Sequence, residues 1–146
     1  MSLEQWAADG WVRRHTTSRQ EIAGLFAIVE RDLQDASKKG ISADWRFGIA
    51  YNAALKLCTV LLHASGYRPE RSLHHYRTIQ ALPLILGESR KDDVGYLDAC
   101  RIKRNTVEYD TAGAASHADA DELVALAKQL REEVSRWLKK HHPRLL

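Results

Sequence analysis

The hydrophobic positions of the chain repeat with a helical period. Apolar residues return every three or four positions, which places them on one face of an α-helix. This holds for residues 22–33, for residues 47–64 and, most regularly, for a stripe near the C-terminus. That last stripe consists of Leu123, Ala127, Leu130, Val134 and Trp137. No segment alternates convincingly between apolar and polar positions, so the pattern predicts helices throughout.

Capping residues divide this pattern into separate helices. A small polar residue before an apolar run, often with an acidic or amide side chain three residues later, marks a helix start. The predicted starts are Ser2 with Gln5, Ser18 with Glu21, Ser42 with Asp44, Ser72, Ser89 with Asp92, and Asp119 with Glu122. Gly40, Gly66, Pro83 and the small residues of 111–116 separate the helices. Because short connections place successive helices side by side, we expect an all-α, up-and-down antiparallel bundle of five to six helices.

Length and composition indicate one globular domain. The chain has 146 residues, of which 45% are hydrophobic and 28% charged, as in a folded soluble protein. We expect a single domain over 1–146, with a short helix and a connection in 1–17. Lys56 and His63 interrupt the most apolar stretch, so no membrane span is expected. The first residues lack the basic-then-apolar order of a secretory signal, and the two cysteines form no Cys-x-x-Cys pair, so we expect a cytoplasmic protein.

Several familiar chemical motifs are missing from the sequence. It contains no glycine-rich nucleotide loop, no His-Glu-x-x-His zinc motif and no Gly-x-Ser-x-Gly nucleophile elbow. The seven histidines show no metal-like spacing, so we expect no metal and no cofactor. Cys58 lies within an apolar stripe, which favours a buried thiol over a nucleophile.

Five polar residues late in the chain share one helical face, here called the polar arc. They are Arg101, Arg104, Asn105, Glu108 and Tyr109, and on a helix they fall within about 140° of one another. Guanidinium groups bind phosphate oxygens, and a tyrosine ring stacks on a nucleobase. The same residues also suit an ordinary surface ion pair and hydrogen bonds across a helix interface. The arc is therefore a candidate binding site with a plain structural alternative.

Several of these features together resemble the HEPN domains (higher eukaryotes and prokaryotes nucleotide-binding). They are the helix order, the Gly66-Tyr-Arg-Pro turn after a long apolar helix, His74-His75 near the next helix start, and Arg104-Asn105-x-x-x-Tyr109. The resemblance covers roughly residues 18 to 140. It implies an all-helical bundle that forms a homodimer, with the arginine-bearing helices of both chains lining a shared cleft. Many such domains are metal-independent ribonucleases, often toxins paired with a nucleotidyltransferase, whereas others only bind.

The sequence departs from the pattern of the active ribonucleases. Those enzymes have an arginine, then four to six residues, then a histidine that transfers a proton. Counting from Arg104 or from Arg101 reaches no histidine. Arg68 with His74 or His75 has the right spacing but crosses a proline-containing turn, and Arg136 with His141 or His142 lies at the terminus. Arg104 and Tyr109 remain the candidate catalytic residues.

Three functions follow as expectations. The first is a homodimeric HEPN-like module that binds RNA or a nucleotide through Arg101, Arg104, Asn105, Glu108 and Tyr109, with weak or absent catalysis. The second is a metal-independent ribonuclease toxin, for which the resemblance implies a nucleotidyltransferase partner. The third is a non-catalytic protein-interaction partner whose polar arc makes protein contacts.

Overall fold

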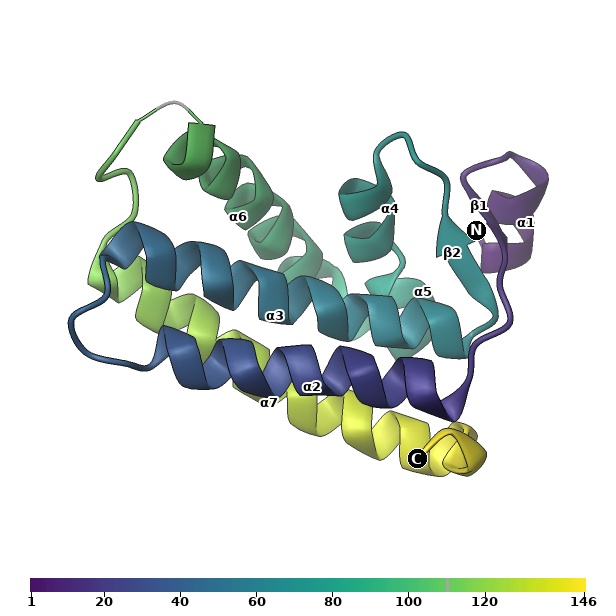
Figure 1. The fold of residues 1–146 in the computed structure, drawn as a ribbon. Coiled ribbons are helices and arrows are strands. Elements are labelled where there is room, and N and C mark those ends of the chain that lie inside the picture. The colour runs from purple at the N-terminus through teal and green to yellow at the C-terminus, as the bar shows by residue number, and fades with distance from the viewer. Residues whose placement is uncertain (110) are drawn as a thin grey trace.

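The computed structural model describes residues 1–109 and 111–146, except for the side chain of Tyr109. The described residues are mostly helical, with one pair of very short strands (Figure 1). The elements are α1 (Leu3–Ala8), β1 (Val12–Arg14), α2 (Arg19–Ala36), α3 (Ala43–Ala64), β2 (Tyr67–Pro69), α4 (His74–Gln80), α5 (Leu82–Leu86), a 3₁₀ turn (Glu88–Arg90), α6 (Lys91–Tyr109), α7 (His117–His141) and a 3₁₀ turn (Pro143–Leu145).

The predicted all-α bundle is confirmed, since helices make up 74% of the structure. The four long helices, α2, α3, α6 and α7, alternate in direction along the chain, as an up-and-down bundle requires (Figure 1). Lys103 of α6 pairs with Asp119 of α7 at 2.7 Å, and Arg90 pairs with Glu133. Helices α4 and α5 form a short excursion between α3 and α6 (Figure 1).

Helix α3 is the centre of the core. It packs against α2, α6 and α7, and side chains over most of its circumference are buried. The remaining face, with Lys56, Thr59 and His63, is only partly buried. Phe47, Leu57 and Leu61 are among the largest side chains that are completely buried. By length and composition α3 is apolar enough to cross a membrane, but 67% of that stretch is buried inside the fold. Contact with the other helices therefore accounts for its apolar composition.

The two strands lie where the sequence predicted only breaks between helices. β1 and β2 pair antiparallel, with Val12 opposite Pro69 and Arg14 opposite Tyr67. Each strand has only three residues, which is too short to show an alternating pattern in the sequence. Beyond β1, the backbone N–H of His15 donates to the carbonyl of Gly66 at 2.9 Å. The strand pair thus fixes the connection before α2 against the end of α3.

Three of the predicted helix starts are confirmed by capping contacts. The side chains of Ser2, Ser18 and Ser42 accept hydrogen bonds from backbone N–H groups in the first turns of α1, α2 and α3. Each bond satisfies a donor that has no partner within its helix.

The other starts differ from the prediction. Leu73, not Ser72, precedes α4, and it has a left-handed backbone (φ 57°) and no side-chain cap. A 3₁₀ turn, not a cap at Ser89, leads into α6. Helix α7 begins earlier than expected, because Ser116 and Asp119 form a reciprocal capping box. Asp119 is thus the third residue of that helix and not its cap. Pro83 does end a helix as expected, since the chain breaks between α4 and α5.

Candidate functional site

A large pocket lies between the strand pair, the second half of α3, and α4. Its volume is about 650 Å³. It is lined by Arg13, His15, Glu21, Leu55, Lys56, Thr59, His63, Arg68, Pro69, Arg71, His74, His75 and Thr78. We call this the basic pocket, because four of these side chains are cationic and only one is acidic.

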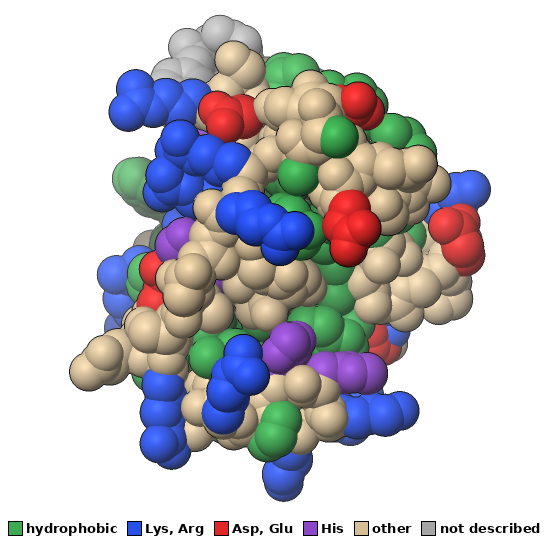
Figure 2. All heavy atoms as spheres, turned by 90° about the vertical axis from the view of Figure 1, so that its right-hand side faces the viewer, with side chains coloured by type: hydrophobic (Ala, Val, Ile, Leu, Met, Phe, Trp, Pro, Cys, Tyr) green, Lys and Arg blue, Asp and Glu red, His purple; other side chains and the backbone are tan. Residues whose placement is uncertain are grey.

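The charge of the basic pocket favours an anion. The positive charge comes from four side chains, Arg13, Lys56, Arg68 and Arg71. Among the ion pairs of the described residues, only Arg13 of these four has an acidic partner, with its Nε 3.8 Å from Glu70 Oε1. Figure 2 views the end of the molecule that carries the strand pair, and Lys and Arg side chains gather along the left edge of this view, with a histidine among them. A concave surface with cationic walls concentrates field lines and attracts phosphate groups.

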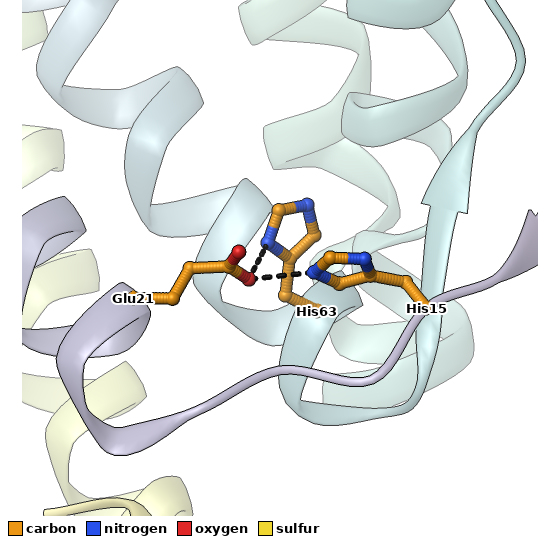
Figure 3. A group of neighbouring side chains, drawn as sticks. All are labelled: His15, Glu21 and His63. Carbon is orange, nitrogen blue, oxygen red and sulfur yellow. Dashed lines mark hydrogen bonds and ion pairs between the residues drawn. The ribbon is translucent and has the colours of Figure 1, made fainter.

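Three residues from distant parts of the chain meet at one wall of the basic pocket. His15 Nε2 and His63 Nδ1 each lie 2.7 Å from Glu21 Oε1 (Figure 3). The two imidazole rings are stacked at a tilt, with centroids 4.4 Å apart. We call His15, Glu21 and His63 the His–Glu cluster. No spacing in the sequence indicated it, since these residues stand at positions 15, 21 and 63.

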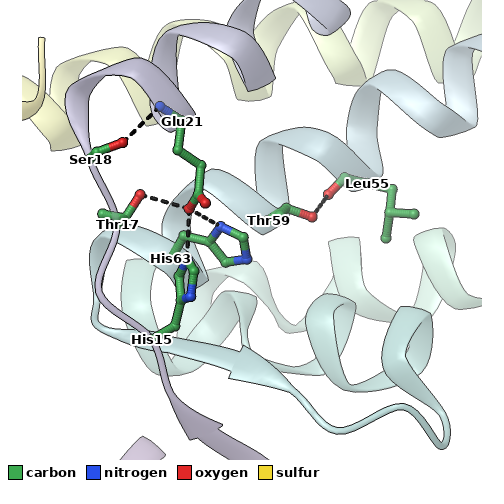
Figure 4. A network of polar contacts seen from close by, with 7 residues as sticks. All are labelled: His15, Thr17, Ser18, Glu21, Leu55, Thr59 and His63. Carbon is green, nitrogen blue, oxygen red and sulfur yellow. Dashed lines mark hydrogen bonds and ion pairs between the residues drawn. The ribbon is translucent and has the colours of Figure 1, made fainter.

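Local backbone structure holds the His–Glu cluster in place. Glu21 lies in the first turn of α2, where the Ser18 side chain caps its backbone N–H (Figure 4). This leaves the carboxylate free for other contacts, and Thr17 Oγ1 donates to Oε1 at 2.8 Å. His63 lies in the last turn of α3, one turn after Thr59. From the sequence, Glu21 was predicted only as a helix-start residue, and nothing in the local pattern indicated this second role.

The cluster changes the protonation of its members. Burial alone would raise the Glu21 pKa, but the hydrogen bonds from His15 and Thr17 and the contact with His63 outweigh it and lower the pKa to about 2. Burial lowers the pKa of His63, and the attraction of Glu21 only partly offsets this. At neutral pH, Glu21 is therefore ionised and His63 neutral.

The residues of the polar arc of α6 are divided between two separate hollows. Arg101 pairs with Asp98 at 2.8 Å and lies over the ring of Tyr76, 5.7 Å from its centroid. Arg101 and Asn105 line a small hollow of about 190 Å³ beside residues 73–76. This half of the arc therefore faces α4.

The other half of the arc faces the start of α3. Arg104 Nε lies 3.1 Å from Glu108 Oε1, and the guanidinium sits 5.8 Å from the ring centroid of Tyr51. Glu108 lines a separate hollow with Trp45. The Tyr109 side chain, the fifth member of the predicted site, lies outside the described residues.

His74 and His75 connect the basic pocket with the hollow beside Arg101, because both line each of them. His75 Nδ1 is 3.4 Å from Tyr51 Oη. Burial, the neighbouring His74 and the charge of Arg104 together lower the His75 pKa to about 4. His75 of α4 thus lies close enough to Arg101 and Arg104 of α6 for their positive charges to lower its pKa. The sequence has no histidine four to six residues after Arg101 or Arg104, but the packing of α4 against α6 brings His75 near them.

Protonation of His75 is expected to destabilise the fold. Its folded-state pKa of about 4 is below the ordinary value of 6.5, so the unfolded chain binds more protons in between. The contribution of His75 to stability is complete above pH 6.5 and is lost as the pH falls from there towards 4. Urea unfolding at pH 7 and at pH 5 should show a smaller pH effect for His75→Gln than for the wild type. An identical effect in both proteins would contradict this assignment.

Both cysteines are buried thiols, in agreement with the sequence interpretation of Cys58. Burial raises the pKa of Cys58 to about 12 and that of Cys100 to about 11. Neither is a thiolate at neutral pH, so neither has the form that attacks as a nucleophile.

No family model, no curated protein and no solved structure matches this chain. The function is therefore argued from the geometry and charge of the site.

Proposed function

We propose that this protein is a HEPN-like module that binds RNA or a nucleotide through phosphate groups. The observation that carries the proposal is the lining of the basic pocket, with four cationic side chains against the single carboxylate of Glu21. That carboxylate already accepts three hydrogen bonds, which stabilise its single negative charge, and the four cations outnumber it. The remaining positive charge is available to an anionic ligand.

The neighbouring hollow extends the proposed site towards the polar arc. A single-stranded RNA that leaves the basic pocket over His74 and His75 would reach Arg101 and Asn105. The ring of Tyr76 lies there under the Arg101 guanidinium. Positive charge beside an aromatic ring is the combination that binds single-stranded nucleic acid, because phosphates pair with the cations and bases stack on the ring. Asn105 adds an amide that both donates and accepts hydrogen bonds.

The proposal includes a second copy of the chain as partner. Trp45 and Ile102 are large apolar side chains that are 63% and 55% exposed. Ile102 lies on α6, which carries the polar arc, and Trp45 lies on α3, which faces part of it. Covering such residues in a dimer removes apolar surface from water. Light scattering should give the mass of a dimer, and Ile102→Glu should shift it towards the monomer. A monomeric wild type would contradict this part of the proposal.

RNA binding is tested by fluorescence anisotropy with a labelled single-stranded RNA of about ten nucleotides. Arg68→Ala removes an exposed cation of the basic pocket and should weaken binding roughly equally for different sequences. Phosphate contacts make binding salt-dependent, so the affinity should fall steeply between about 50 and about 200 mM salt, less steeply in the variant. Lys139→Ala is the matched control, because it removes a cation from the end of α7 that does not line the pocket.

Two outcomes would contradict the proposal. One is the absence of RNA and mononucleotide binding at low salt. The other is equal binding by the wild type and Arg68→Ala with an equal salt dependence. Equal losses in Arg68→Ala and Lys139→Ala would indicate attraction by net charge alone, which also contradicts a defined site.

A metal-independent ribonuclease is the second candidate function. It is favoured by the position of His75, whose pKa responds to the charges of Arg101 and Arg104. Arginine beside a neutral imidazole provides a phosphate-binding group and a proton acceptor, the two elements that attack by the RNA 2′-hydroxyl requires.

A further inference from the structure

The His–Glu cluster has the composition and geometry of a metal site. We propose that His15, Glu21 and His63 bind one divalent transition-metal ion, with Zn²⁺ as the best match. Their three ligand atoms, His15 Nε2, Glu21 Oε1 and His63 Nδ1, all lie within 4.8 Å of one another. Two imidazoles with one carboxylate form the ligand set of many catalytic zinc sites, in which a fourth position stays open.

The directions of the two imidazoles support this assignment. Both ring nitrogens point at the same carboxylate oxygen, as Figure 3 shows. A neutral imidazole that carries its proton on the other ring nitrogen presents a lone pair along the same direction. With both rings in that tautomer, the two lone pairs and the carboxylate converge on one small region that a cation can occupy.

The ligands are also assembled before any ion arrives. His15 is fixed by its backbone bond to Gly66, Glu21 by the cap at Ser18, and His63 by the end of a buried helix. Thr17 Oγ1 holds the carboxylate oxygen from outside the set, which is the kind of supporting contact that orients metal ligands. A preassembled site loses little conformational entropy on binding.

The cluster is open to the basic pocket. The side chains of His15 and His63 are 18% and 16% exposed, and both line the pocket wall. An ion held there keeps a coordination position towards the pocket. The surrounding cations, among them Arg68, oppose a bare metal ion but favour an anion as its next ligand. A phosphate oxygen or a hydroxide meets both requirements.

The contrasting interpretation is a hydrogen-bonded clasp that ties β1 to α3 and binds no metal. Glu21→Gln separates the two, because the glutamine carbonyl still accepts hydrogen bonds from the imidazoles but carries no charge. If the cluster is a clasp, the wild type and Glu21→Gln should be equally stable and neither should bind a metal ion. If it is a metal site, Glu21→Gln should still fold but bind the metal ion more weakly than the wild type.

The test uses the full-length protein without a histidine tag, freed of metal with a chelator and titrated with ZnCl₂ in a calorimeter. We expect one Zn²⁺ per chain with a Kd of about 10 µM or lower, and a visible absorption band when Co²⁺ replaces Zn²⁺. Glu21→Gln and His63→Ala should each weaken binding at least about tenfold. His141→Ala is the control, because its histidine lies at the end of α7, outside the cluster, and it should bind Zn²⁺ like the wild type.

Circular dichroism of the metal-free proteins shows whether each variant folds. If His63→Ala does not fold, Glu21→Gln alone decides whether the cluster binds zinc. The proposal is overturned if the wild type binds no Zn²⁺ in this range, or if Glu21→Gln binds it as tightly as the wild type. No RNA takes part in the titration, so this outcome is independent of the proposed RNA binding.

Discussion

Replacing Leu61 by Ala is expected to lower the free energy of unfolding by about 2 to 5 kcal/mol. Leu61 is completely buried in the last turn of α3, the helix that contacts all the other long helices. The substitution removes apolar contacts and leaves a cavity that the surrounding helices fill only in part. For a domain of this size, such a loss is a large fraction of the total stability.

Urea unfolding followed by circular dichroism measures this change. Leu146→Ala is the matched control, because it removes the same side chain from the C-terminus, where Leu146 is 44% exposed. Its effect should stay within about 0.5 kcal/mol, as for most surface positions. Similar losses in the two variants would mean that α3 is not the centre of the core.

Helical periodicity predicted the bundle because each long helix has a continuous apolar face to bury. The broad apolar face of residues 47–64 became the central helix, and the stripe from Leu123 to Trp137 became the inner face of α7. Local capping chemistry predicted Ser2, Ser18 and Ser42 as helix starts, because each capping contact joins residues within four positions of each other in the sequence. The start of α4 could not be predicted in this way, because Leu73 begins it without any side-chain cap.

The candidate site depends on contacts that no local pattern contains. His15 reaches His63 only because the strand pair, invisible in the sequence, lays the first connection along the end of α3. Glu21 was predicted as a capping residue, and its backbone is indeed capped, but its carboxylate serves the cluster instead. A sequence without aligned relatives gives no signal that these residues act together.

The polar arc shows a different limit. Helical geometry correctly placed Arg101 and Asn105 on the same side of α6, where they share a hollow. It did not indicate that α4 would lie opposite them or that Glu108 would face Trp45 in a separate hollow. Which residues face a helix is set by the packing of other elements, so the role of the arc in RNA binding stays a prediction.

If the protein cleaves RNA, His75→Gln is expected to reduce the cleavage rate by about 100- to 10,000-fold. Burial, together with the charges of Arg104 and Arg101, lowers the pKa of His75 to about 4, which leaves its ring nitrogen unprotonated at pH 7 but makes it a weaker base than an ordinary histidine. His75 takes the proton of the 2′-hydroxyl as that oxygen attacks the phosphorus, while the arginines hold the phosphate oxygens. The bond to the 5′-oxygen then breaks, and that oxygen takes a proton from solvent water as it leaves.

The measurement is cleavage of a labelled single-stranded RNA in the presence of a chelator, which removes any contribution of a metal at the His–Glu cluster. RNA affinity should change at most a few-fold in His75→Gln, because glutamine keeps a polar side chain in the pocket wall. His141→Gln, at the far end of α7, is the control and should cleave at the wild-type rate. Cleavage by His75→Gln at the wild-type rate would remove His75 from the mechanism. A wild type that binds RNA without cleaving it would instead identify a binding module, because the arginines then hold the phosphate and no group completes the proton transfer.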